Sequence, residues 1–237
     1  MCGDRRIRSS GPRGGADRLE LCRALDRDGL TPPLALFSEV HDAVALPIVV
    51  MIRPYDRGYV YSEVQFSRMA AEAEEFADRG AAGIAIGALA ADGSVDAPRL
   101  SDLVGRLDRA EVVFHRAFDE VPDFEEALEV LIACGVKRVL TSGGHPSAAE
   151  GNDIIRSLHR LAAGRIEVLP GAGIGPDNVG RLLRKTGCRQ VHGTFRAPSG
   201  PSVGTDREVV VGVRRTLDQA TQSKTGETFS GQVVPPC

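Results

Sequence analysis

Tryptophan is absent from this chain of 237 residues, and aromatic residues make up only 5% of it. A surface that stacks on nucleic-acid bases needs aromatic side chains together with positive charge. The formal net charge is instead −3 at pH 7. No apolar run approaches the ~20 residues of a membrane span, and the N-terminus lacks the apolar stretch of a signal peptide. We therefore expect a cytoplasmic protein that binds neither nucleic acid nor a membrane.

Cysteine is scarce and scattered. The five cysteines are Cys2, Cys22, Cys134, Cys188 and Cys237, with no close pair and no C-x-x-C zinc pattern. An odd number of separated thiols argues against a disulfide framework. Cys134 and Cys188 adjoin glycines at predicted helix-to-strand joints, where each is expected to be a small buried hydrophobe. Cys22 alone stands at the end of a predicted strand.

The chain does contain a repeat of strand, loop, helix and glycine at intervals of about 30 residues, the length of a βαβ unit. Predicted strands cover residues 16–22, 48–53, 83–87, 111–118, 138–143, 165–169 and 189–194. They are short and apolar without strict alternation, which indicates a parallel sheet covered on both faces. The predicted fold is α/β, a TIM-type (β/α)₈ barrel with its first strand missing or irregular. The barrel is expected to span residues 14–220, between an irregular arm (1–13) and a disordered tail (221–237).

The stretch from Val112 to Asp119 is the most informative one. An apolar, β-branched start leads without a turn into His115, Arg116 and Asp119. In barrels of parallel strands, catalytic groups lie at the carboxyl ends of the strands. Side chains alternate along a strand, so we expect His115 to point into the barrel and Arg116 to lie at the rim. For Asp119 a structural role is equally open, in which it pairs with Arg116 and caps the next helix.

Other predicted strands also end in polar or small residues. These are Glu20 and Cys22, Arg53, Gly87, Thr141 and Ser142, Gly171 and Gly173, and His192 and Thr194. The amino ends carry Asp17, Pro47, Arg138, Arg165 and Arg189, which we interpret as a solvated rim. This coincidence over several strands predicts a site for a small polar molecule, with Thr141, Ser142, Gly171 and Gly173 among its binding residues.

The residue types suggest roles within such a site. His115 or His192 would act as a general acid or base, because an imidazole titrates near neutrality. Glu20 and Asp119 would orient or share protons. Arg53 or Arg116 would hold a carboxylate or a phosphate.

The glycine-rich stretch 171–178 precedes a predicted helix. Glycines allow the backbone to approach a ligand closely, and a helix N-terminus favours an anion. This pattern is typical of a phosphate site, although a plain tight turn explains it equally well.

Taken together, these motifs resemble those of the CutC family, which is named for copper homeostasis. The resemblance covers residues 14–220 and depends on the segments 15–22, 29–33, 51–54, 61–62, 114–119, 139–143 and 170–174, and on His192. It implies a cytoplasmic, oligomeric TIM barrel. It also implies that the family's site includes Glu20, Cys22, Arg53, His115, Arg116, Asp119, Thr141, Ser142 and His192.

The chain departs from the family pattern in one important way. The family's first strand, which carries a Glu and a Cys, has no counterpart before Gly14. Strands at both ends of the sheet would then present unpaired edges, which favours self-association.

Two functions follow from the resemblance and the residues. The first is Cu(I) binding by Cys22, since Cu(I) prefers soft thiolates, with His115 and His192 as candidate partners. The alternative is an enzyme acting on a small anionic or sugar-like metabolite, including phosphorylated ones. Loss of the first strand would also be consistent with a non-functional remnant.

Overall fold

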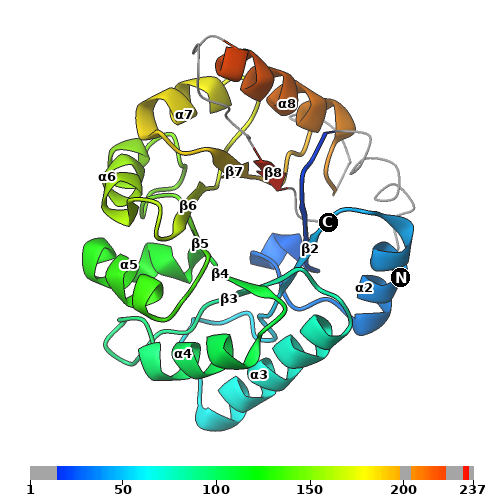
Figure 1. Ribbon diagram of the computed structural model, residues 1–237, viewed down its shortest axis with the longest axis vertical. Coiled ribbons are helices and arrows are strands. Elements are labelled where there is room, and N and C mark those ends of the chain that lie inside the picture. The colour runs from blue at the N-terminus through cyan, green and yellow to red at the C-terminus, as the bar shows by residue number, and fades with distance from the viewer. Residues whose placement is uncertain (1–14, 198–203, 223–231, 235–237) are drawn as a thin grey trace.

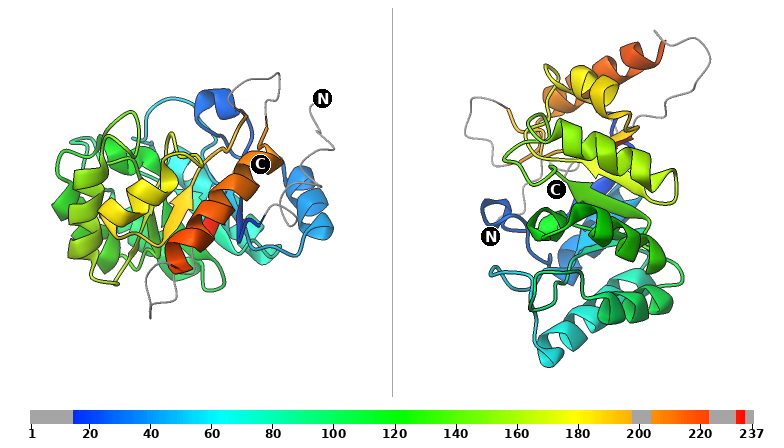
Figure 2. Two further views of the ribbon diagram at one scale, coloured as in Figure 1. Left: turned by 90° about the horizontal axis from the view of Figure 1, so that it is seen from above. Right: turned by 90° about the vertical axis from the view of Figure 1, so that its left-hand side faces the viewer.

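The computed structural model describes residues 15–197, 204–222 and 232–234. Its strands form the inner layer of the molecule and its helices the outer one (Figures 1 and 2). The strands are β1 (Leu19–Leu21), β2 (Ile48–Met51), β3 (Gly83–Ile86), β4 (Glu111–Phe114), β5 (Arg138–Thr141), β6 (Glu167–Pro170), β7 (Gln190–His192) and β8 (Gln232–Val234). The α-helices are α2 (Leu34–Ala43), α3 (Glu63–Asp78), α4 (Ala97–Arg106), α5 (Phe124–Ala133), α6 (Asn152–Ala162), α7 (Val179–Thr186) and α8 (Arg207–Gln222). Short 3₁₀ helices η1 (Leu25–Arg27) and η2 (Arg116–Glu120) follow β1 and β4.

The strands are parallel and follow one another in chain order. β1 to β6 form one sheet, in which each strand pairs with the next. The sheet curls around a central axis, and β7 follows β6 around the ring (Figure 1). Parallel order with a helix after each strand is the TIM-type α/β fold that the repeat predicted.

The eighth strand comes from the C-terminal tail. β8 pairs in parallel with β7, with Val191 opposite Val233. In Figure 1 it lies between β7 and the dark blue segment that carries β1. The prediction of a disordered tail is therefore wrong for Gln232–Val234, which supply a backbone partner for β7. The predicted N-terminal arm lies outside the described residues.

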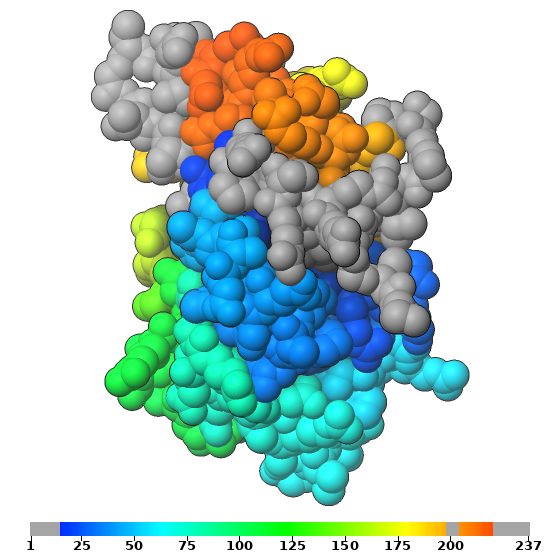
Figure 3. All heavy atoms as spheres, turned by 90° about the vertical axis from the view of Figure 1, so that its right-hand side faces the viewer, coloured from blue at the N-terminus to red at the C-terminus, as the bar shows by residue number. Residues whose placement is uncertain are grey.

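The helices lie outside the strands and follow one another around them (Figure 1). Figure 3 shows the flank that carries α8 in orange, α2 in blue and α3 in cyan. No helix among the described residues is long and apolar enough to cross a membrane.

Alternating side chains along the strands divide the core into two parts. Leu21, Val50, Ile84 and Phe114 belong to the large cluster between the sheet and the helices. Their neighbours on the other strand face form a small separate cluster inside the barrel, made of Cys22, Val49, Met51, Ala85 and Val113. The residues that continue this inward face toward the carboxyl ends of the strands therefore line the barrel mouth.

Local chemistry sets the helix boundaries. Ser62 and Gln65 form a reciprocal capping box at the start of α3, and the Asp123 carboxylate accepts hydrogen bonds from two amides at the start of α5. The Thr31 hydroxyl, just before α2, does not cap that helix but accepts a hydrogen bond from the Arg53 amide (2.8 Å). Thr31 thus joins the loop after β1 to the end of β2.

Of the residues predicted to form a solvated rim at the amino end of the barrel, Pro47, Arg165 and Arg189 are exposed, whereas Arg138 is not. Arg138 is only 11% exposed and pairs with Glu111 of the neighbouring strand, while its Nε donates to Gln190 of β7. Arg18 is also buried there. The amino end of the barrel therefore contains a partly buried Arg138–Glu111 ion pair, and the candidate site residues lie at the opposite end.

Candidate functional site at the barrel mouth

His115 follows β4 directly and is the most buried imidazole at the mouth, at 3% exposure. Its Nδ1 accepts a hydrogen bond from the Ala117 amide (3.1 Å), which starts η2 and ends the strand earlier than the predicted 118. Its Nε2 is buried and has no hydrogen-bond partner among the described residues. Burial, helped by the nearby Arg53 charge, lowers the pKa of His115 from 6.5 to about 3.

Gly87, at the end of the neighbouring β3, makes room for this ring. A Cβ at position 87 would lie 2.4 Å from His115 Cε1 and 2.8 Å from the Ala117 Cβ. Real Cβ atoms do not approach ring atoms this closely. The absence of a side chain at position 87 is therefore a requirement of the His115 position, not of the backbone turn.

Arg53 follows β2 and is 5% exposed. One guanidinium nitrogen, Nη1, donates to the backbone carbonyls of Arg27 (2.7 Å) and Gly29 (3.1 Å). The Nε atom is buried without a partner among the described residues. The Tyr59 ring contacts both the Arg53 guanidinium and the His115 imidazole. Its centroid lies 5.4 Å from Arg53 Cζ and 5.2 Å from the centroid of the His115 ring.

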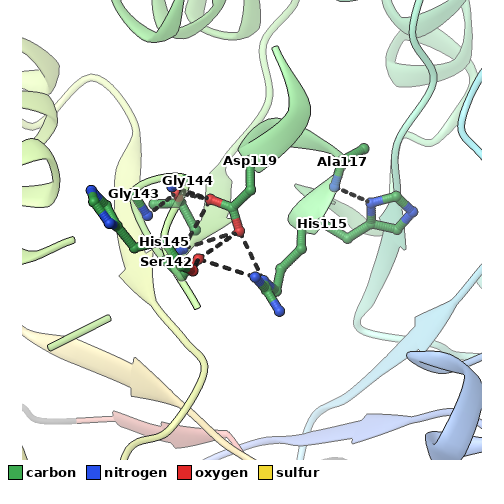
Figure 4. Close-up of polar contacts among 9 residues, drawn as sticks. His115, Ala117, Asp119, Ser142, Gly143, Gly144 and His145 are labelled. Atoms are coloured by element: carbon green, nitrogen blue, oxygen red, sulfur yellow. Dashed lines mark hydrogen bonds and ion pairs between the residues drawn. The ribbon is translucent and has the colours of Figure 1, made fainter. Parts of the chain in front are cut away.

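Asp119 is held by hydrogen bonds from the end of β5 (Figure 4). Its Oδ1 accepts from the Thr141 hydroxyl (2.5 Å) and from the amides of Ser142 (3.0 Å) and Gly144 (3.1 Å). Its Oδ2 lies 2.8 Å from Arg116 Nε and 3.0 Å from the Ser142 hydroxyl. With both oxygens engaged, this carboxylate ties η2 to the loop after β5.

The Asp119 cluster and His115 face different ways. Figure 4 shows the His115 ring turned away from the Asp119 carboxylate. Arg116 is half exposed at the rim, where its Nη2 also donates to Ser142 (3.0 Å). The expected orientation, with His115 inside and Arg116 at the rim, is confirmed. The pairing of Arg116 with Asp119 is also confirmed, but the carboxylate caps the β5 loop instead of the following helix.

Glu20 and His192 meet across the mouth from β1 and β7. His192 Nε2 lies 3.8 Å from Glu20 Oε1, and both side chains are almost buried. The second imidazole nitrogen, Nδ1, is buried without a partner among the described residues. A Cβ on Gly171 would lie 3.6 Å from the His192 ring and 2.6 Å from Leu140 Cδ1, so glycine keeps this side of the imidazole close to β6.

The loop after β6 is bridged by its own side chain. The Asn178 amide group accepts from the Gly175 backbone (3.0 Å) and donates to the Gly173 carbonyl (2.7 Å). Gly173 has φ +68° and Ala172 φ +79°. The bridge uses one of the amides that a phosphate would need, so the geometry supports the tight-turn interpretation of this stretch.

Cys22 lies inside the barrel, 3% exposed. A Cβ on Gly29 would be 3.4 Å from its Sγ and 3.8 Å from the Met51 Cε, so the Cys22 thiol and the Met51 terminal methyl group both lie next to Gly29. Cys134 and Cys188 are buried elsewhere, and burial raises the pKa of Cys188 to about 12.

Across residues 15–197, 204–222 and 232–234, no three His, Cys, Asp or Glu side chains form a group that could hold a metal ion.

The predicted residues thus separate into three groups. Glu20 and His192 form one, Arg53 and His115 a second, and Asp119 a third with Arg116, Thr141 and Ser142. Sequence reasoning missed Tyr59 and Met51. The tyrosine-rich loop after Arg53 was a signal for Tyr59. Met51 lies two residues before Arg53 in the same predicted strand, so its side chain points to the same inner face of the barrel, and this spacing was a signal for Met51.

A barrel of parallel strands with helices around it is a TIM-type α/β fold, and in this chain buried polar side chains gather at its mouth. The chain belongs to the CutC family, whose family model matches residues 7–197. It is 42% identical over 224 residues to a CutC family protein of Treponema denticola, covering 94% of this chain and 84% of that one. It is 41% identical over 185 residues to the human copper homeostasis protein cutC homolog, covering 78% and 68%.

Solved structures agree with this assignment. The crystal structure of the CutC protein of Streptococcus agalactiae has a TM-score of 0.71 at 28% identity, covering 75% of this chain and 88% of that one. Phosphoribosylanthranilate isomerase of Pyrococcus furiosus has a TM-score of 0.56 at 15% identity, covering 87% and 91%. The second likeness shows the shared fold alone.

Proposed function

We propose that this protein acts in copper homeostasis in the cytoplasm and that it handles Cu(I) through Cys22. The family assignment and the name of the human relative support the copper role. The single observation that supports the chemistry is that Cys22 and Met51 belong to one small buried cluster inside the barrel, next to Gly29. Thiolate and thioether sulfurs are the donors that Cu(I) prefers.

The surroundings of the two sulfurs suit Cu(I). Val49, Ala85 and Val113 surround them with apolar groups, and a dry, apolar shell restricts solvent access to a bound metal. The His115 imidazole is a poor additional ligand, because Nδ1 accepts the Ala117 amide and the proton therefore resides on Nε2. His192 has a buried Nδ1 without a described partner, so it is the better imidazole candidate.

An anaerobic competition titration with a chromophoric Cu(I) chelator tests this proposal. We expect Cys22→Ala to weaken Cu(I) binding by about tenfold or more, which corresponds to about 1.4 kcal/mol, and Met51→Leu to weaken it less. Cys188→Ala is the matched control, because it removes a buried thiol from another part of the fold. Equal Cu(I) affinity of the wild type and Cys22→Ala would exclude Cys22 as the ligand.

We also propose that the protein is a homo-oligomer. Among the described residues, β1 pairs with β2 and with no second strand, and an open strand edge is a template for self-association. Light scattering on the eluting species of a size-exclusion column measures the mass directly. A monomer at micromolar concentration would contradict this part of the proposal.

A second candidate function is an enzymatic activity on a small anionic or sugar-like metabolite. The observation in its favour is the buried Glu20–His192 pair, since an imidazole beside a carboxylate is a common general acid–base arrangement. A thermal-shift screen of metabolites against the wild type and His192→Ala tests it. A ligand that stabilises both proteins equally would remove His192 from the role.

A further inference from the structure

Two buried nitrogen donors at the barrel mouth have no partner among the described residues. They are Arg53 Nε and His115 Nε2, on side chains that are 5% and 3% exposed. A buried N–H group without an acceptor costs free energy, and most such groups in native proteins are paired. Two of them, after β2 and β4 with β3 between these strands, therefore indicate that something outside the protein chain supplies the acceptor.

The chemistry and hydrogen bonds of each side chain determine whether its unpartnered nitrogen is a donor or an acceptor. The Ala117 amide occupies the lone pair of His115 Nδ1, so the neutral imidazole carries its proton on Nε2 and offers a donor there. The Arg53 guanidinium has no acceptor lone pair and is always protonated. Both free nitrogens are consequently donors, and the missing partner is an acceptor.

The positive charge of the Arg53 guanidinium indicates the charge of the missing acceptor. Both hydrogen bonds of the Arg53 side chain go to neutral backbone carbonyls, those of Arg27 and Gly29. They orient the guanidinium, and no carboxylate within the described part of the chain makes a hydrogen bond to it. A buried charge needs compensation by an opposite charge. An anion would satisfy the Arg53 charge and the two donors together.

Arg53 and His115 both contact Tyr59, and the Arg53 charge acts on the His115 imidazole. The Tyr59 ring lies 5.4 Å from Arg53 Cζ and 5.2 Å from the His115 ring. Gly87 also fits against the imidazole, at a position where any side chain would collide with it. The imidazole is therefore confined by its packing, as expected of a group in a preformed binding site.

We propose that Arg53 and His115 form a subsite for an oxygen-bearing anion, a carboxylate or a phosphate group of a small molecule. This proposal names the ligand class of the second candidate function and depends on that use of the mouth. It is independent of copper binding, because Cys22 takes no part in it. The single positive charge of Arg53 beside a neutral imidazole matches a carboxylate best.

The test is a titration of histidine-¹⁵N-labelled protein, followed by NMR of the His115 ring nitrogens. Sodium acetate and sodium phosphate are added separately, and sodium chloride keeps the ionic strength constant. We expect saturable shifts of the His115 Nε2 signal, with acetate binding at least as tightly as phosphate. Binding of phosphate alone would assign the subsite to phosphate and reject the carboxylate preference. The absence of a saturable shift with either anion would overturn the proposal.

Variants distinguish a specific anion subsite from non-specific attraction of anions by positive charge. We expect Arg53→Gln to weaken anion binding about tenfold or more, since charge-assisted bonds are the strong ones, whereas Arg79→Gln, on the exposed end of α3, leaves it unchanged. Arg53 also holds the 27–29 backbone, so Arg53→Lys is a second variant that keeps the charge but lacks Nε. Cys188→Ala, at a buried thiol in another part of the fold, is expected to bind anions normally. Equal loss in Arg79→Gln would contradict the assignment.

Discussion

At the scale of single residues, His115 shows how burial changes chemistry. The parity of the 112–119 stretch was enough to predict that this side chain points inward. The sequence could not reveal its hydrogen bond to the Ala117 amide or the Gly87 space that receives the ring, because both depend on the neighbouring strand and the following turn. Those contacts convert a nominal acid–base group into a neutral hydrogen-bond donor.

The lowered pKa of His115 predicts a loss of stability in mild acid. Its pKa falls from 6.5 to about 3 on folding, so the unfolded chain binds the extra proton between these values and stability rises with pH across that window. From about pH 7.5 to about pH 5 the loss from this group is about 2 kcal/mol. Urea unfolding at both pH values measures it. His115→Gln should lose less over the same interval, and an identical loss would contradict the account.

Gly87 gives a prediction with an internal control. Gly87→Ala forces a methyl group onto the His115 ring, and such overpacking costs about 1–3 kcal/mol of unfolding free energy. Gly105→Ala, within α4 and with no atom near the added Cβ, is expected to stabilise by up to about 1 kcal/mol. Chemical denaturation of both variants measures the difference. A Gly87→Ala protein as stable as the wild type would show that His115 can move.

At the scale of elements, strand and helix positions followed from the periodicity, but the end of β4 did not. The run 112–118 is apolar enough to predict a longer strand, whereas the chain turns into η2 after Phe114. The role of Asp119 was left open between chemistry and capping. Its hydrogen bonds to the β5 loop join two elements that are separate in sequence, and no local pattern could distinguish this from a catalytic position.

The connection between η2 and the β5 loop should weaken in Asp119→Asn. This change replaces one acceptor oxygen by a donor facing the amides and hydroxyl groups of the loop, and lost bonds to a charged group cost about 1.5–3 kcal/mol. Faster amide hydrogen exchange at Ser142 and Gly144 is the local measurement. Asp153→Asn, 81% exposed on α6, is the control. Unchanged exchange at both amides would refute this role for Asp119.

At the scale of the whole molecule, the barrel and the family were predictable from the spacing of the repeat and its motifs. The source of the eighth strand was not. Gln232–Val234 pair with β7, and such long-range pairing leaves no trace in the local sequence of a polar tail. The edge of β7 that the sequence left unpaired is thereby covered by the chain itself.

A chain that ends at Gln222 should therefore be less stable and more prone to associate. Loss of β8 exposes the β7 edge and its unsatisfied backbone groups. We expect a lower Tm and a higher average mass in light scattering. Removal of residues 235–237 alone is the control, because it leaves β8 in place. An unchanged Tm and mass for the chain ending at Gln222 would show that β8 contributes nothing to barrel closure.

The most direct test of the central claim is copper X-ray absorption spectroscopy on the protein loaded anaerobically with one equivalent of Cu(I). Sulfur scattering from the Cys22 thiolate and the Met51 thioether should dominate the copper environment of the wild type. It should fall in Cys22→Ala and persist in Cys188→Ala. A copper environment that is the same in wild type and Cys22→Ala would contradict a Cu(I) site inside this barrel.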